Sequence, residues 1–215
     1  MPATAFKKVG VLIGCRGVVF AKLTKDDSTG VTYETELHSA PGVVEVALTA
    51  LTSSDNLGAD DVALYEILNS VDGFDLSMTM ASLGNDGRAF LLGNKIDDNG
   101  VLIESSDDIA PYVAMGLITA RSDGSDDYIW LYKGQFVQSD ATFRTKEKGQ
   151  VNWQTPTVKA SFAPRINDKR IRAILHSKDD SSQEALKTFF DAPYTPVISA
   201  PAATAETGET TGTEE

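Results

Sequence analysis

Residues 109–133 constrain the fold of this chain more than any other stretch. Two apolar runs, 111–120 and 128–133, flank a turn rich in Ser, Asp and Gly, which is typical of a β-hairpin. Successive side chains of a strand point to opposite faces. One face of the second run would therefore carry three aromatic residues and the other face two aliphatic residues: Tyr128, Trp130 and Tyr132 against Ile129 and Leu131. Because both faces are apolar, the sequence predicts a central hairpin that is covered on both sides.

Most of the remaining chain has strand patterns separated by turn signals. Further strands are expected at 18–23, 43–51, 62–68, 76–83, 101–104, 157–163 and 170–175. Residues 25–30 have a turn composition, and Asn167-Asp168 predicts a hairpin between the last two strands. Short helices are expected at 86–94, closed by Gly93, and at 182–190. The chain is therefore predicted to be mainly β, a β-sandwich or partly closed barrel with one or two short flanking helices.

The length of 215 residues and the apolar fraction of 41% fit one domain with a real core. We place this β domain at residues 1–192. Pro, Ala, Thr, Gly and Glu dominate residues 193–215, which carry no basic residue. Such a segment cannot bury enough apolar surface to offset the entropy of ordering it, so we expect a disordered acidic tail.

The chain offers few groups for catalysis. Cys15 is the only cysteine, and we expect it to be a small buried thiol rather than a nucleophile. His38 and His176 are the only histidines and lack the spacing of a zinc site. No phosphate-binding glycine loop is present, and the acidic pairs lack the register of a calcium loop. We expect no cofactor and no enzyme, although His176 with a nearby carboxylate is kept as a minor hydrolase hypothesis.

The charge distribution excludes one class of function and leaves another open. A formal net charge of −12 argues against a protein held on nucleic acid by phosphate neutralisation. No apolar run reaches the roughly 18 residues of a membrane helix, so no membrane partner is expected. One local basic cluster stands out, and its members are Arg165, Lys169, Arg170 and Arg172. This cluster fits either a solvated outer face or a salt-bridged contact with an acidic neighbouring subunit.

A more specific pattern runs through the centre of the chain. Ala110-Pro111-Tyr112-Val113-Ala114 begins it, and Ser122-Asp123-Gly124 follows. Tyr128-Ile129-Trp130-Leu131-Tyr132-Lys133-Gly134 and Gln154-Thr155-Pro156-Thr157 complete it in the same order. This series closely resembles the phi13-type major tail proteins of long-tailed, non-contractile bacteriophages. The likeness covers about residues 9–178 and leaves the acidic tail outside.

The resemblance implies a structural virion protein, the major subunit of the tail tube. Six copies would form a ring whose joined sheets line a channel, and stacked rings would conduct DNA without binding it specifically. The implied partners are further copies of the chain, a tape-measure protein, and tail-terminator and baseplate proteins. The protein would be made and assembled in the host bacterial cytoplasm and reside in the virion. The alternative is a non-catalytic β-sandwich module that binds carbohydrate or a host cell-surface component through strand aromatics such as Trp130.

Two long polar segments are the candidate contacts between subunits, 52–61 and 138–153. The first is either a long loop or a protruding hairpin, and the second is expected to be an exposed loop. Long segments without regular structure are uncommon in a compact domain unless they have a function. The candidate interface residues on these segments and in the basic cluster are Ser54, Asp55, Asp60, Arg144, Lys146, Lys148, Arg170 and Arg172.

Overall fold

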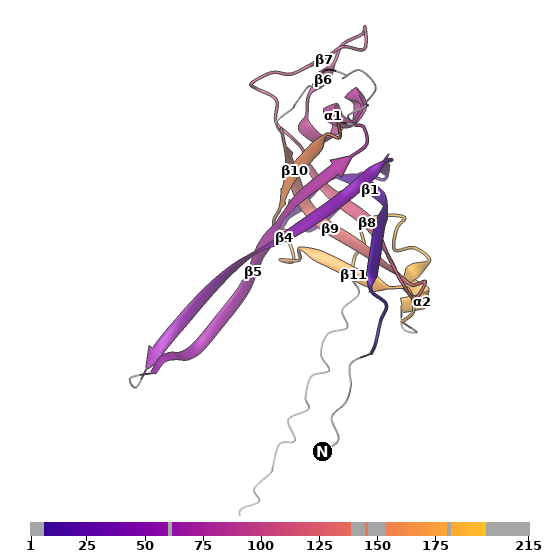
Figure 1. Cartoon of the computed structure of the whole chain (residues 1–215). Coiled ribbons are helices and arrows are strands. Elements are labelled where there is room, and N and C mark those ends of the chain that lie inside the picture. Colours follow the sequence, from indigo (N-terminus) through magenta and orange to yellow (C-terminus); the bar gives the residue numbers. More distant parts are fainter. Residues whose placement is uncertain (1–6, 60–61, 139–144, 146–153, 180–181, 197–215) are drawn as a thin grey trace, which may run out of the picture.

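The computed structural model describes residues 7–59, 62–138, 145, 154–179 and 182–196 (Figure 1). This part of the chain is mainly β, as the sequence predicts, with two short helices. The strands are β1 (Leu12–Asp27), β2 (Gly30–Tyr33), β3 (His38–Ala40), β4 (Val43–Ala59), β5 (Val62–Met80), β6 (Lys95–Ile96), β7 (Leu102–Ile103), β8 (Tyr112–Arg121), β9 (Asp126–Val137), β10 (Thr157–Phe162) and β11 (Arg172–His176). The helices are α1 (Asn85–Leu92) and α2 (Gln183–Leu186).

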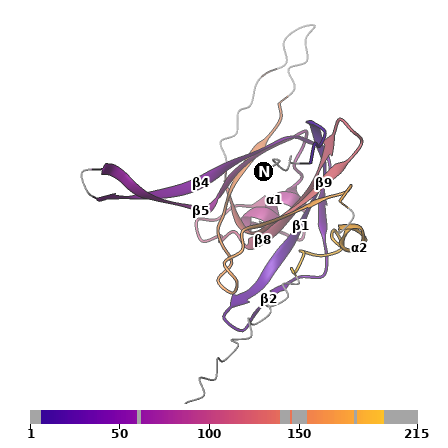
Figure 2. The same ribbon diagram turned by 90° about the horizontal axis from the view of Figure 1, so that it is seen from below.

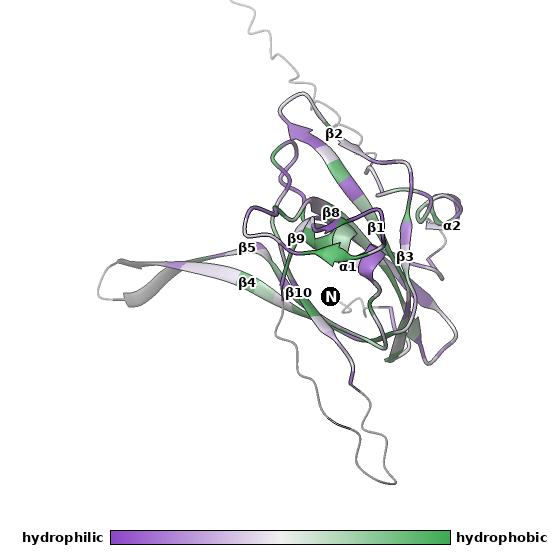
Figure 3. Cartoon of the chain, turned by 90° about the horizontal axis from the view of Figure 1, so that it is seen from above, coloured by the Kyte–Doolittle hydropathy of each residue, from purple (hydrophilic) through white to green (hydrophobic). Residues whose placement is uncertain are grey.

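Nine of these strands form one antiparallel sheet. Its order is β2-β1-β8-β9-β10-β5-β4, with β3 beside β1 and β11 beside β9. Seen along its axis, the sheet curls around α1 (Figure 3). Within the described ranges the strand path ends at β2 on one side and at β4 on the other, and these two strands do not pair with each other. The sheet is therefore β-sandwich-like and does not close into a barrel. β6 and β7 form a separate two-stranded ribbon.

The predicted central hairpin is confirmed as β8 and β9. Gly124 has a φ of 74°, in the left-handed region, and closes the turn by donating its N–H to the carbonyl of Arg121. Trp130 and Leu131, on opposite faces of β9, are both fully buried. The hairpin is therefore covered on two sides by two separate apolar clusters.

The larger cluster lies on the inner face of the curled sheet, the face toward α1. Strict alternation places Leu76, Met78 and Met80 of β5 in this cluster, beside Phe162 of β10. Leu91 of α1 closes it. α1 ends at Gly93, whose φ of 77° is the left-handed conformation that glycine adopts most easily. The helix predicted at 86–94 is thus confirmed.

The smaller cluster lies on the outer face and is covered by the end of the described chain. Trp130 and Tyr132 pack here against Phe189, and the Trp130 indole N–H donates to the Phe189 carbonyl over 2.7 Å. Tyr194 stacks on Phe189 with ring centres 4.9 Å apart. The packed chain therefore extends past the predicted domain boundary at residue 192. Residues 197–215, most of the expected tail, lie outside the described residues.

Three local predictions differ from the structure. Residues 25–27 belong to β1, which pairs with β2 across Asp27↔Gly30, so the turn is shorter than expected. β10 and β11 do not form a hairpin with each other. Instead, both lie along the same edge of β9, with β10 beside Gly134–Val137 and β11 beside Asp127–Leu131. The second helix is also shorter than expected, because only Gln183–Leu186 is α-helical.

Candidate assembly interface

The outer half of the β4–β5 ribbon projects from the body of the molecule (Figures 1 and 2). β10 supports β5 only from Phe74 to Thr79. Beyond the register shift between Leu51 and Thr52, β4 and β5 pair only with each other in the described residues. We call this outer part, residues 52–59 and 62–71, the arm. The sequence left open whether 52–61 forms a loop or a protruding hairpin, and the hairpin is confirmed.

The arm presents a mixed surface to solvent. Ser54 and Asp55, two predicted interface residues, lie on it and are exposed. Leu68 pairs with Asp55 across the ribbon and is 69% exposed, and Val71 is also exposed. An isolated two-stranded ribbon is marginally stable in water, because neither face is covered. The arm is therefore the part of the described chain that most needs a partner surface.

The sheet also leaves two edges open. One edge of β1 pairs with β8 along most of the length of β1. The other edge of β1 pairs with β3 only at Val18–Phe20 and with β2 only at the C-terminal end of β1. From Leu12 to Gly17 that second edge has no partner among the described strands. Ile13 on this edge is 68% exposed. The outer edge of β4 is the other open edge. Unpaired N–H and C=O groups of this kind can pair with another chain.

The predicted basic cluster is only partly a surface. Arg165 is 2% exposed, and its guanidinium lies 3.9 Å above the Tyr132 ring while pairing with Asp168. Burial alone would raise the pKa of Asp168, but hydrogen bonds from Arg165 and from the Arg170 backbone outweigh it and lower that pKa. Arg165 therefore fixes the β10–β11 connection from within and is not available to a neighbouring subunit.

Arg170 and Arg172 differ in what they contact. The strand predicted at 170–175 begins only at Arg172, so Arg170 lies outside β11. The Arg170 guanidinium lies 3.1 Å from the Asp168 carboxylate. Arg172 is exposed and stacks over the Phe74 ring at 4.5 Å. Lys169, between them, is also exposed, so positive charge remains on this surface.

The strand aromatics are not available to stack on a sugar. Trp130 and Tyr132 are fully buried on the outer face, under Phe189 and Phe190, and Tyr128 is half-buried in the same cluster. Burial raises the pKa of the Tyr132 hydroxyl to about 12. The observation that motivated a carbohydrate-binding surface is thus absent from this face.

His176 does meet a carboxylate, in a structural arrangement. Its Nδ1 lies 2.7 Å from Asp127 Oδ1, and the other oxygen of Asp127 accepts from Arg121 Nε at 3.0 Å. Arg121 also donates to the Gly10 carbonyl at 2.6 Å. The network ties the ends of β8, β9 and β11 to the N-terminal segment. The role of Arg121 could not be predicted from the sequence, because Asp126-Asp127 has the composition of a solvated turn.

Cys15 lies too far from this histidine to act with it. Cys15, Thr119, Asp127 and His176 occupy one register line across β1, β8, β9 and β11. Neighbouring strands are about 4.8 Å apart, so Cys15 is about 10 Å from the backbone of Asp127 and farther from His176. The thiol is half-buried rather than fully buried. His38 is occupied elsewhere, stacked on Phe90 with ring centres 4.1 Å apart.

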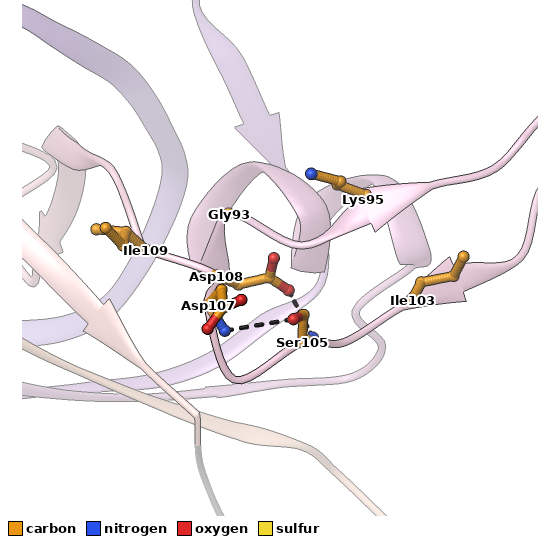
Figure 4. A pocket seen from close by; sticks show the side chains of 7 residues that line it. All are labelled: Gly93, Lys95, Ile103, Ser105, Asp107, Asp108 and Ile109. Carbon is orange, nitrogen blue, oxygen red and sulfur yellow. Dashed lines mark hydrogen bonds between the residues drawn. The ribbon is translucent and has the colours of Figure 1, made fainter.

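A hollow of about 450 Å³ lies beside the β6–β7 ribbon (Figure 4). Its lining residues are Gly93, Lys95, Ile103, Ser105, Asp107, Asp108 and Ile109. Asp108 accepts from Asn94 Nδ2 at 3.0 Å and from the Ser105 N–H at 2.8 Å, and these bonds lower its pKa. The described residues nowhere bring together three or more His, Cys, Asp or Glu side chains that could hold a metal ion.

Four of the predicted interface residues cannot be placed. Asp60, Arg144, Lys146 and Lys148 lie outside the described residues, as does most of the segment 138–153. Within the ranges that are described, no helix is both long and apolar enough to span a bilayer.

No protein-family model matches the chain. A search of curated proteins gave no match either. What the fold and these surfaces define is a class: a mainly antiparallel β protein with a projecting two-stranded arm and open sheet edges.

Proposed function

We propose that this protein is the major subunit of a bacteriophage tail tube, a structural virion protein without catalytic activity. Copies would assemble into hexameric rings, and the rings would stack into the channel that delivers DNA. Tape-measure, tail-terminator and baseplate proteins would be its other partners. The sequence pattern of residues 110–157 supports this family, and two properties of the folded chain, the arm and the open sheet edges, support self-assembly.

The arm is the observation that carries the proposal. It extends two strands into solvent, and no third strand or helix of the described part of the chain covers either face. Leu68 and Val71 are exposed on it. Because such a ribbon gains little stability by itself, its length and regularity favour a role in which another copy covers it.

The open edges and the net charge support the same function. Pairing the free edge of β1 with a neighbouring copy would remove an edge that otherwise invites aggregation. A contact between two different surfaces of one chain closes into a ring or continues as a filament. A net charge of −12 would keep DNA from adhering to the wall of such a channel.

Removal of the arm tests the proposal. Residues 53–70 are replaced by Asn-Gly, which forms a two-residue turn and is flanked here by the existing pair Thr52↔Val71. The purified wild-type chain should form rings or hollow tubes by negative-stain microscopy and light scattering. The shortened variant should keep its circular dichroism and thermal midpoint but form no rings or hollow tubes.

A truncation of similar length, deletion of residues 197–215, is the matched control, and it should still assemble. A wild-type chain that stays monomeric at high concentration would overturn the proposed function. Normal tubes from the shortened variant would show that the arm is not an assembly element.

A further inference from the structure

Two exposed surfaces of the chain have opposite charge. The first is the segment 95–109, which we call the acidic excursion, and it contains the β6–β7 ribbon. It carries five carboxylates against one lysine, a net charge of −4. The second is the segment 166–174, which we call the basic patch, and it leads into β11. It carries three cationic residues against one aspartate, a net charge of +2.

Both surfaces also expose aliphatic side chains among their charges. On the acidic excursion Ile109 is 80% exposed, and Val101 and Ile103 are exposed as well. On the basic patch Ile166 and Ile174 are exposed. Large aliphatic groups surrounded by charges of one sign are typical of a protein-protein contact, in which a polar rim encloses an apolar centre.

The geometry of the acidic excursion suits a cationic side chain. The lining of the hollow beside β6–β7 includes Asp107 and Asp108, with Ile109 on one side of them and Ile103 on the other (Figure 4). Asp107 is exposed, and Asp108 is held in place by Asn94 and Ser105. An arginine or lysine that entered this hollow would bring its aliphatic stem against the isoleucines and its charge against the carboxylates.

The basic patch offers side chains of that kind. Lys169 and Arg172 are exposed, and the buried pair between Arg165 and Asp168 fixes the loop that carries them. The two surfaces lie on separate parts of the molecule, the excursion at the end near α1 and the patch beside β9 (Figure 1). One copy can therefore use both surfaces at once.

We propose that the acidic excursion of one copy docks onto the basic patch of a second copy. The contact joins two different surfaces, so it is head-to-tail and repeats along a ring or a filament. This inference rests on the proposed self-assembly and identifies one of its interfaces. It is independent of the arm, whose deletion leaves both surfaces intact.

Charge exchange between two variants tests the contact. The first variant, Asp98→Lys with Glu104→Lys and Asp107→Lys, changes the net charge of the acidic excursion from −4 to +2, so that both surfaces are cationic. The second, Lys169→Glu with Arg172→Glu, has anions on both. Each variant alone should give no sedimentable polymer, because like charges face each other. An equimolar mixture should assemble, because each reversed surface then meets a complementary surface on the other variant. Recovery in the mixture also shows that both variants are folded.

Engineered cysteines provide a second measurement. In a Cys15→Ser background, Ile103→Cys with Ile174→Cys should give a ladder of disulfide-linked oligomers after mild oxidation of the assembled protein. Either cysteine alone should give no covalent dimer, since residue 103 faces residue 174 of the next copy.

Four outcomes overturn the inference. Covalent dimers from a single-cysteine variant would show a symmetric contact. Tubes that form from each charge variant alone, or variants that stay unassembled when mixed while the wild type forms tubes, would exclude this pair of surfaces and leave the proposed function standing. A wild type that never assembles would overturn both.

Discussion

Arg165 and Asp127 are charged residues in buried positions, and each is held by partners that sequence spacing does not reveal. Arg165 pairs with Asp168 three residues away and stacks on Tyr132 of β9. Asp127 shares its two oxygens between Arg121 and His176. Buried ions of this kind stabilise a fold only while every partner is present. At both sites the charge serves to fix a strand end rather than to perform chemistry.

The pKa of Asp127 gives the first prediction. Burial alone would raise that pKa, but the hydrogen bonds from Arg121 and His176 outweigh it and hold the pKa below the ordinary value of 3.8. A carboxyl group whose pKa is lower in the folded chain than in the unfolded chain stabilises the fold at pH values above its unfolded pKa. This stabilisation is lost as the pH falls through the folded pKa. Asp127→Asn should therefore lower the free energy of unfolding by about 1–3 kcal/mol at pH 6. The difference from the wild type should shrink below pH 3.8.

Urea unfolding between pH 6 and pH 2.5 measures this difference. Asp98→Asn, at an exposed turn position, is the control and should change stability by less than about 0.5 kcal/mol across the range. A difference for Asp127→Asn that stays constant down to pH 2.5 would contradict the proposed role of its carboxylate.

At the scale of elements, α1 shows how a local signal can fix a boundary. Gly93 ends the helix with a φ of 77°, and its N–H donates to the Ala89 carbonyl at 2.9 Å. A Cβ at this position would collide with the backbone carbonyl of Ile109. Gly100, in the β6–β7 turn, has a similar φ of 80° but open space around it. Substitution at Gly100 would therefore show only the cost of the left-handed backbone conformation, whereas substitution at Gly93 would add the cost of the collision with Ile109.

Substitution of each glycine by alanine gives the second prediction. Gly100→Ala should cost about 1–2 kcal/mol, because only the left-handed conformation is penalised. Gly93→Ala should cost a further 1–3 kcal/mol or so, because the Ile109 backbone must also move. Thermal unfolding of the two variants beside the wild type gives both values. Equal losses would show that the chain around Ile109 relaxes freely.

Elements with strong local signals could be predicted from the sequence, and the pairing of distant strands could not. Gly93 and the alternation of Leu76, Met78 and Met80 correctly gave the first helix and the β5 strand. The connection between β10 and β11 has hairpin chemistry at Asn167-Asp168, yet both strands pair with β9. Turn residues indicate that the chain changes direction, but they do not indicate which strand the following segment pairs with. The expected hairpin was wrong for this reason.

The candidate interface was predictable to a similar degree. A protruding hairpin was one of the two alternatives for residues 52–61, the other being a long loop, because these residues are polar and long for a connection. The burial of Arg165, away from its exposed basic neighbours, was not anticipated, since it depends on contacts with Tyr132 on another strand. The acidic excursion was also missed. Its carboxylates are scattered between turns, and only the fold places Asp107 and Asp108 on the lining of one hollow.

At the scale of the whole molecule, the sheet of the described strands is curled but not closed. Its interior is well packed around α1, whereas its periphery has an uncovered arm and unpaired edges on β1 and β4. Proteins that remain monomeric usually blunt such edges with charges, prolines or covering loops. From Leu12 to Ile13 this chain instead places large aliphatic side chains on its open edge.

A charge on this edge gives the last prediction. Ile13 is 68% exposed, so Ile13→Lys should change the stability of the isolated chain by less than about 0.5 kcal/mol. The lysine should nevertheless block the joining of the β1 edge to a second copy, because its charge would lose water at the contact without gaining a partner. Ile13→Val keeps the shape and β propensity of the edge and should assemble as the wild type does. Light scattering during assembly compares all three chains, with circular dichroism as the measure of folding. Because the substitution touches neither the arm nor the acidic excursion, normal assembly of Ile13→Lys would show that the sheets of neighbouring copies do not join through β1 and that the arm and charged surfaces suffice.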